Sequence, residues 1–268
     1  ILKQFIIILV IIMNTKITLL LVLALFSVST SPIIGRALTG VGAVSISFWR
    51  MFIAAIVLWL FSAIKPQKKM HSKNNLFKTL FAGVLLGIHF ALFFEAIKIT
   101  KIANATFLGT LAPLFTLFIE LFVLKRKYNK SVLLGLLFTL IGSIIILGYQ
   151  FDLESKYTLG NLYAVICSIC IALALMIGER VRSQENTIVY TRTLYLSASC
   201  TLFFIAFGVN EELTGYKFNE YLGLAFLGLV PTILGHNSIY YSIRYVSPTI
   251  AAAFPLGEPI IATIFAYF

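Results

Sequence analysis

Residues 103–124 read ANATFLGTLAPLFTLFIELFVL. Only Glu120 is charged in this run, and Pro113 lies at its centre. As a helix rising about 1.5 Å per residue, the run is long enough to cross a hydrocarbon core of roughly 30 Å. It therefore predicts a transmembrane helix with an interruption at its middle, because proline lacks the backbone N–H that a helix needs.

Runs of this kind recur along the whole chain. Hydrophobic residues make up 60% of the sequence and charged residues only 12%, against roughly 25% charged residues in soluble domains. This is the composition of an all-α integral membrane protein. The runs predict nine transmembrane helices, at residues 17–35, 44–64, 77–97, 103–124, 131–149, 159–178, 190–209, 221–243 and 248–268.

The net charge of +11 comes from basic residues in the short connections between these runs. When the connections are assigned to alternate sides of the membrane, fourteen Lys and Arg lie on one side and five on the other. The side with fourteen, which includes the stretch from Lys65 to Lys78, is predicted to be cytoplasmic. Basic residues at headgroup level explain the charge without a nucleic-acid partner.

The three cysteines all fall inside apolar runs. Cys167 and Cys170 form a C-x-x-C pattern, but in the middle of a membrane we interpret them as small packing residues and not as a redox or metal pair. The sequence contains no G-x-x-x-x-G-K-[ST] loop, which argues against an ATP-driven pump in one chain. No cofactor is predicted.

An internal repeat divides the chain. An aromatic-x-Arg pattern ends at Arg50 and again 142 residues later at Arg192, and Pro113 matches Pro259 at an offset of 146. We interpret residues 13–150 as a first repeat of five helices and residues 151–268 as a second repeat. Because five is odd, the second repeat must enter the membrane upside down, as in many secondary transporters.

Both ends of the chain carry a further expectation. Residues 1–12 are mostly apolar but too short to span a bilayer, and Met13 resembles a natural start, so we interpret 1–12 as an upstream extension. The chain stops at Phe268 within an apolar run. The second repeat is therefore expected to lack its fifth helix, the tenth of the protein.

Three stretches together resemble a known family: Phe48-Trp49-Arg50, ANATFLGTLAPLF at 103–115, and Leu256-Gly257-Glu258-Pro259. They are similar to the EamA branch of the drug/metabolite transporter superfamily, and the resemblance covers residues 13–268. It implies ten helices, both termini in the cytoplasm, and export or exchange of amino acids, related metabolites or drugs across a bacterial inner membrane. The chain has Leu124-Lys125-Arg126 where the family often has Gly-Glu.

Ionisable residues deep in a bilayer are costly and mark a transport pathway by default. Glu258 is expected at the membrane midplane, where it could bind and release a proton and so couple transport to protons; His236 is a second candidate for this role. The alternative is that Glu258 only holds helices together, in a pair with Arg50. The full predicted substrate pathway contains His89, Pro113, Thr232, His236, Asn237, Tyr240, Glu258 and Pro259.

Spacing and proline chemistry select the other pathway residues. Thr232, His236, Tyr240 and Arg244 recur every four residues and predict a polar stripe on one helix face, leading toward the cytoplasm. Pro113 and Pro259 free backbone groups that a watery cavity could satisfy, although a simple kink that shapes packing is the alternative.

Arg50 begins a span near the outer face and is expected to reach the lipid headgroups there by snorkelling. For Arg50 and Arg192 we favour structural anchoring, and direct contact with the substrate is the alternative. Glu120 is expected to pair with Lys125, near the cytoplasmic end of its helix.

These features favour a secondary carrier that moves a small organic solute and that is surrounded by lipid. A membrane-embedded transferase acting on lipid-linked substrates is the first alternative, but paired carboxylates or an activated nucleophile are not visible. A membrane scaffold without transport is the second, and it leaves the inverted repeat unexplained. The sequence does not fix the substrate, the coupling to protons or the oligomeric state.

Overall fold

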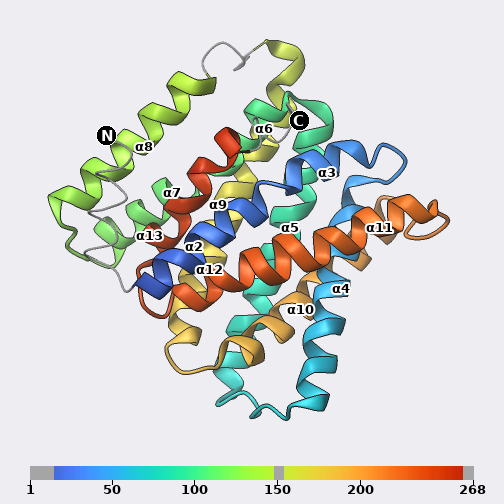
Figure 1. Cartoon of the computed structure of the whole chain (residues 1–268), viewed down its shortest axis with the longest axis horizontal. Helices are drawn as coiled ribbons and strands as arrows, with labels where there is room; N and C mark the ends of the chain where they lie inside the picture. The colour runs from blue at the N-terminus through green and yellow to red at the C-terminus, as the bar shows by residue number, and fades with distance from the viewer. Residues whose placement is uncertain (1–14, 148–153, 262–268) are drawn as a thin grey trace.

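The computed structural model describes residues 15–147 and 154–261. Every regular element within these ranges is helical (Figure 1). Seven helical segments are long and apolar enough to cross a membrane, namely Thr15–Ala37, Ala43–Ile64, Lys73–Ile99, Ile102–Val123, Ser155–Arg182, Thr187–Gly208 and Phe218–Ser242. The predicted all-α membrane architecture is therefore confirmed at this level. The expected features of residues 1–12 and of a tenth helix lie outside the described residues.

The first half of the chain contains α2 (Thr15–Val28), α3 (Ser31–Ala37), α4 (Ala43–Ile64), α5 (Lys73–Ile99), α6 (Ile102–Gly109), α7 (Ala112–Phe118), the π-helix η1 (Ile119–Val123) and α8 (Lys130–Leu147). The second half contains the 3-10 turn η2 (Ser155–Tyr157), α9 (Thr158–Arg182), α10 (Thr187–Gly208), α11 (Phe218–Leu227), the π-helix η3 (Gly228–His236), α12 (Asn237–Ser242), α13 (Pro248–Ala253) and the 3-10 turn η4 (Phe254–Gly257).

The expected interruption near Pro113 is present. The helix stops at Gly109 and starts again at Ala112, with Pro113 in the first turn of α7. Proline is favoured at this position because the first N–H groups of a helix have no partner within it. A second interruption lies in the last described segment, where α13 tightens into η4 at 254–257.

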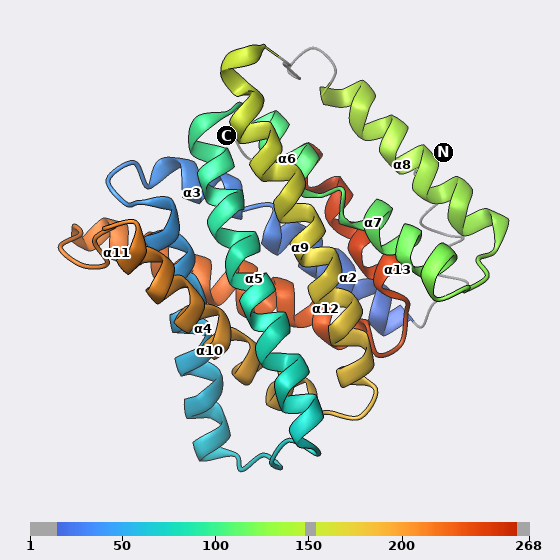
Figure 2. The ribbon, with the colours of Figure 1, turned by 180° about the vertical axis from the view of Figure 1, so that it is seen from behind.

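Long helices pack around α5, which runs through the centre of the bundle between α9 and α10 (Figures 1 and 2). Further extensive contacts join α10 to α4, α2 to η3, and α13 to α7. Helix α8 lies at the periphery in both views. Large apolar side chains such as Phe138 and Phe204 remain exposed on the outer surface, as expected for a surface in contact with lipid.

Close packing of α5 against α10 depends on Gly83. A Cβ atom at this position would lie 2.5 Å from the Cβ of Ser197 and 2.7 Å from the backbone oxygen of Leu194. Small residues at such crossings let helix backbones approach closely, which stabilises helix association in membranes. Gly142 on α8 differs in this respect, because no atom lies within 4 Å of the position that its Cβ atom would occupy.

Gly83→Ala is expected to lower the stability of the folded protein by about 1–3 kcal/mol through overpacking. Gly142→Ala adds the same methyl group to a helix with open space beside it, and should leave stability unchanged or slightly higher. Thermal unfolding of both variants in detergent measures the difference. Equal melting temperatures for the two variants would show that the α5–α10 contact is looser than described.

Candidate functional site

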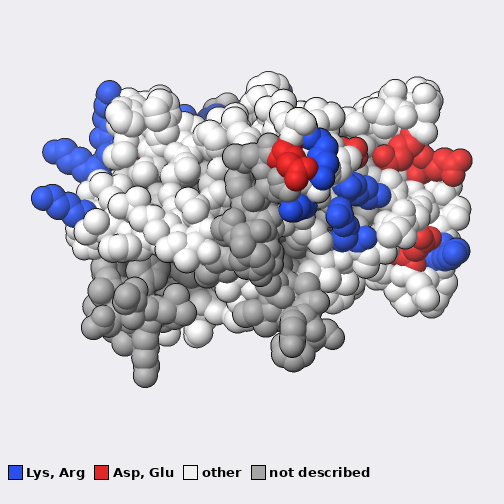
Figure 3. Space-filling view, turned by 90° about the horizontal axis from the view of Figure 1, so that it is seen from above, with Lys and Arg blue, Asp and Glu red and all other residues white. Residues whose placement is uncertain are grey.

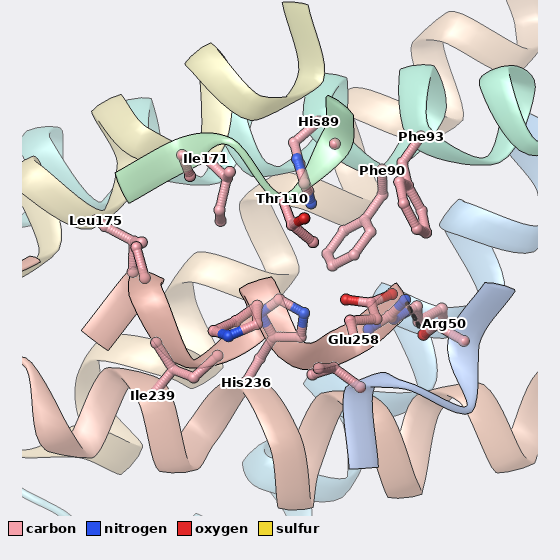
Figure 4. Close-up of a pocket in the computed structure, with 16 residues that line it drawn as sticks. Arg50, His89, Phe90, Phe93, Thr110, Ile171, Leu175, His236, Ile239 and Glu258 are labelled. Carbon is pink, nitrogen blue, oxygen red and sulfur yellow. Dashed lines mark hydrogen bonds between the residues drawn. The ribbon is translucent and has the colours of Figure 1, made fainter. Parts of the chain in front are cut away.

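The interior of the bundle contains a cavity of about 60 Å³. It lies at the interruption between α6 and α7 and is bordered by α4, α5, α9, α12 and η4 (Figure 4). A space of this size holds a few water molecules, but it is smaller than the roughly 300–1,000 Å³ of typical pockets for drug-sized ligands. The lining residues are Val28, Ser31, Arg50, His89, Phe90, Phe93, Gly109, Thr110, Ala112, Ile171, Leu175, His236, Ile239, Ala252, Pro255 and Glu258.

Arg50 is the largest polar side chain in this cavity and is 1% exposed. Its Nε donates to the hydroxyl of Thr232 at 2.7 Å, and its Nη1 donates to the hydroxyl of Ser31 at 2.8 Å. The guanidinium lies over the ring of Phe90, 4.1 Å from the centroid, in a cation–π contact. Its Nη2 is buried and has no hydrogen-bond partner among the described residues.

The expectation that Arg50 reaches the lipid headgroups is wrong. Arg50 follows the start of α4 by two turns, and its side chain points inward. Two hydroxyl acceptors and an aromatic face hold it there, so snorkelling would lose three favourable contacts. Arg192 lies instead at the periphery, where its guanidinium stacks over Trp59 at 4.5 Å from the ring centroid.

Glu258 is 6% exposed and lines the same cavity. Figure 4 shows its carboxyl group facing the guanidinium of Arg50, from the segment directly after η4. The 3-10 turn before it contains Pro255, and this turn directs the following residue into the bundle. The expected proximity of Arg50 and Glu258 is therefore present, and the two ionisable side chains come from different halves of the chain.

Two histidines complete the polar lining, one on each wall (Figure 4). The Nδ1 of His89 lies 2.8 Å from the carbonyl oxygen of Cys167, so in the neutral ring this nitrogen carries the proton and Nε2 is free to accept. The ring of His236 meets Phe90 edge-on, with centroids 5.2 Å apart. Phe90 thus contacts the rings of both His89 and His236 and supports Arg50.

The structure brings some of the predicted pathway residues together and separates others. His89, His236 and Glu258 line the cavity, and Thr232 holds Arg50. Pro113 is buried on α7, one residue beyond the lining position Ala112.

Three other predicted pathway residues do not line the cavity. Asn237 accepts a hydrogen bond from the Tyr195 hydroxyl at 2.9 Å. Tyr240 packs on Tyr190 with ring centroids 5.5 Å apart, and Pro259 also lies outside the lining.

Of the predicted polar stripe, only His236 lines the cavity, and the route toward the cytoplasm that the stripe was expected to line stays a prediction. Ser31 and Thr110 are lining residues that sequence reasoning did not select, and Arg50 was selected as an anchor and partner of Glu258 but not as a pathway residue. For Arg50 the signal was available: it is the one basic residue within the apolar run 43–64. Within the described ranges, no group of three or more His, Cys, Asp or Glu is placed to hold a metal ion.

A charged cluster around Glu120 closes one side of the bundle. Glu120 is 0% exposed and accepts hydrogen bonds from Arg126 Nη1 at 2.5 Å and from the Tyr128 hydroxyl at 2.6 Å. The hydroxyl of Thr249 also donates to it. Arg126 makes a bidentate pair with Glu179 at 2.8 Å, so the Glu120 cluster joins η1, α9 and α13.

The expected partner of Glu120, Lys125, is thus replaced by Arg126. Lys125 has a φ of 55°, which reverses the chain and turns Arg126 back toward the helix. Hydrogen bonds to Glu179 and then to Glu120 raise the pKa of Arg126. Burial, followed by the hydrogen bond to Glu120, raises the pKa of Tyr128 to about 12, so its hydroxyl remains a donor at physiological pH.

A second cluster, around Glu211, closes the opposite side. The Glu211 carboxylate accepts the backbone N–H of Ser45 at 2.6 Å, and the Ser45 hydroxyl donates to the carbonyl oxygen of Glu212 at 2.7 Å. Trp49 Nε1 donates to the carbonyl oxygen of Leu213 at 2.7 Å. These bonds tie the start of α4 to the connection before α11, at the end of the molecule where acidic side chains gather (Figure 3).

Comparison with known proteins gives one family and several relatives. The profile of the EamA-like transporter family matches residues 14–148 and 158–268. The chain is 23% identical to an uncharacterized transporter of Clostridium kluyveri, covering 89% of this chain and 80% of the relative.

Two relatives carry a substrate in their names. The chain is 23% identical to the pseudopaline exporter CntI of Pseudomonas aeruginosa, covering 87% and 80%, and 27% identical to the riboflavin transporter ImpX of Fusobacterium nucleatum, covering 76% and 71%. A crystal structure matches with a TM-score of 0.78 at 17% identity, over 94% of this chain and 88% of that one, which supports the fold.

Removing Arg126 tests the Glu120 cluster. Arg126→Gln should lower the free energy of unfolding by about 2 kcal/mol or more, because a buried carboxylate loses a charged donor. Lys127→Gln removes the same charge from the next residue, which is exposed, and should leave stability unchanged. Thermal unfolding in detergent measures both variants, and a melting temperature for Arg126→Gln equal to that of Lys127→Gln would contradict the cluster.

Proposed function

Because the chain belongs to the EamA-like transporter family, and is thereby a membrane transporter of small molecules, we propose that it is a secondary carrier that exports small organic metabolites by alternating access. The observation that carries this proposal is the buried cavity containing Arg50 and Glu258. Ionisable residues kept inside a membrane bundle mark a solute or proton pathway.

The closed state of the cavity supports alternating access. At about 60 Å³ it is too small for a metabolite, so a solute enters only when helices separate on one side. The Glu120 cluster and the Glu211 cluster join helices on opposite sides of the cavity. Opening one cluster while the other stays closed would expose the cavity to one side at a time.

The packing of helices supports two inverted repeats, residues 13–150 and 151–268, with α8 and the predicted helix 248–268, which begins with α13, as further membrane crossings. If each helix is replaced by its counterpart in the other half, α5 becomes the segment η3–α12 and α9 becomes α2. The contact between α5 and α9 then corresponds to the contact of α2 with η3 and α12. The α4–α10 and α7–α13 contacts each correspond to themselves. The interruptions at 110–111 and 254–257 fall in corresponding helices, and the family profile matches the chain twice.

The cavity lining also suggests the substrate class. Arg50 offers an unpartnered Nη2 donor that suits a carboxylate or another acidic group. Glu258 can bind either a proton or an amine on the same solute. Small acidic or zwitterionic metabolites, including amino acids, fit this pair. Export is supported by the printed name of one relative, the pseudopaline exporter.

Orientation in the membrane follows from charge. The connection 65–72 and the Glu120 cluster lie among most of the basic residues, and we assign this side to the cytoplasm of a bacterial inner membrane. The connection 209–217, with Glu211 and Glu212, then faces outward. Opening of the Glu120 cluster would admit solute from the cytoplasm, and opening of the Glu211 cluster would release it.

Solute flux into proteoliposomes tests the carrier directly, with a panel of amino acids and metabolites and with or without an imposed pH gradient. Flux raised by the gradient is expected, and Glu258→Gln should abolish the gradient-driven part while the protein stays folded. Glu154→Gln, which changes an exposed carboxylate, serves as the matched control.

Each outcome of this experiment decides between functions. Unchanged gradient-driven flux in Glu258→Gln would remove Glu258 as the coupling residue. If flux through the unmodified protein does not depend on the pH gradient, the protein is a facilitator that is not coupled to protons. No flux of any solute would favour a scaffold or, if a lipid-linked substrate is turned over, a transferase.

Single cysteines test the orientation in a background with Cys167, Cys170 and Cys200 replaced by alanine. Thr214→Cys should react with a membrane-impermeant maleimide added to intact cells, because position 214 is exposed in the connection before α11. Lys68→Cys should react only after the membrane is opened. The reverse pattern would invert the proposed topology.

A further inference from the structure

A second cavity, of about 300 Å³, lies where α4 ends and α5 begins, against α10. It is separate from the central site and plays no part in the proposed transport cycle. Its polar walls include Lys69, Ser72, Lys73 and Arg192. We propose that this cavity, the Arg192 pocket, binds the phosphate group of an anionic phospholipid.

The charge of the Arg192 pocket favours a phosphate. Three of its nine lining residues are cationic, and none of the nine, all within the described part of the chain, is acidic. Basic pockets between transmembrane helices are typical binding sites for lipid headgroups. Arginine and lysine provide charge-assisted donors for phosphate oxygens.

Arg192 is held in position with a donor to spare. Its guanidinium stacks over Trp59 at 4.5 Å from the ring centroid. Its Nη2 reaches the carbonyl oxygen of Lys68 only at 3.4 Å, and its Nε is buried without a partner among the described residues. A buried donor without an acceptor is costly, and a phosphate oxygen in the pocket would satisfy it.

The start of α5 adds a second favourable element. Ser72 caps this helix by accepting the N–H of Asn75 at 3.1 Å, and both Ser72 and Lys73 line the pocket. The N-terminus of a helix carries partial positive charge that stabilises an anion nearby. Helix α5 has 27 residues, so its terminus is a full helix end and not an isolated turn.

Apolar side chains beside the pocket identify the phosphate as that of a lipid. Trp59 and Leu76 line the pocket and are 43% and 40% exposed. Leu80, one turn further along α5 on the same face, is also 40% exposed. Acyl chains would cover this exposed surface below the headgroup, whereas a free phosphate ester would leave it uncovered. If the proposed orientation holds, the bound lipid belongs to the cytoplasmic leaflet. The binding site itself does not depend on that orientation.

Intact-protein mass spectrometry tests the pocket on the full chain in detergent micelles. The probes are dioleoylphosphatidylglycerol, dioleoylphosphatidylcholine and sn-glycerol 3-phosphate. One phosphatidylglycerol is expected to remain bound with about tenfold preference over phosphatidylcholine, and Lys69→Gln with Lys73→Gln should weaken its binding about tenfold or more. Lys127→Gln with Lys130→Gln removes the same charge from the connection before α8 and should have no such effect.

Each other result overturns part of the inference. If both double variants weaken phosphatidylglycerol binding equally, or if the two lipids bind equally well, the binding comes from general surface charge and not from this pocket. Displacement of the lipid by an equal concentration of sn-glycerol 3-phosphate would assign the pocket to free phosphate esters. Arg192→Gln, checked for helical content by circular dichroism, should lose the preference even if the lysine variants fold poorly. Lipid binding is measured without flux, so its failure is distinct from a failure of transport.

Discussion

A guanidinium buried among apolar helices must be compensated where it lies, because removing an ion from water costs several kcal/mol after relaxation. Arg50 is 1% exposed, and much of the interior is arranged around this requirement. Ser31 and Thr232 supply oxygen acceptors, Phe90 supplies an aromatic face, and the carboxyl group of Glu258 faces the guanidinium. These groups come from both halves of the chain, so one buried charge ties the two halves together at the centre of the bundle.

Local irregularities of the helices bring these groups into place. The π-helix η3 contains Pro231 and presents Thr232, whose hydroxyl also donates to the carbonyl oxygen of Leu227 at 2.8 Å. The break between α6 and α7 places Thr110 on the cavity wall, and η4 directs Glu258 inward. Wide turns, breaks and tight turns within membrane helices are tolerated where they line a cavity, and such places often serve function.

The sequence predicted the long helices well and the details of the site less well. Runs at 44–64 and 190–209 correspond to Ala43–Ile64 and Thr187–Gly208, since apolar length alone defines a membrane span. The run at 77–97 is shorter than α5 because hydropathy does not register the polar first turns that start at Lys73.

The predicted stripe on one helix face assumed α-helical spacing from residue 232 onward. The π-helix η3 has more residues per turn and ends at His236, so it changes the direction of Thr232 relative to His236. Tyr240 follows one α-helical turn later with its ring 6.4 Å from that of His236, but it packs on Tyr190 and not on the cavity. The sequence also could not predict that Arg126 is the partner of Glu120. The positive φ of Lys125, which turns Arg126 toward Glu120, is a property of the folded connection. Spacing along a sequence gives the period of a regular helix, and these sites depend on departures from it.

Accessibility of the central cavity from each side tests the account most directly. Thr110 lines the cavity and is 6% exposed, so Thr110→Cys, in a chain otherwise free of cysteine, reports on solvent entry. In oriented proteoliposomes, the account predicts slow labelling by an impermeant thiol reagent from either side, and protection by any solute the protein transports. Labelling from one side only, unaffected by every transported solute, would contradict a carrier with alternating access to this cavity.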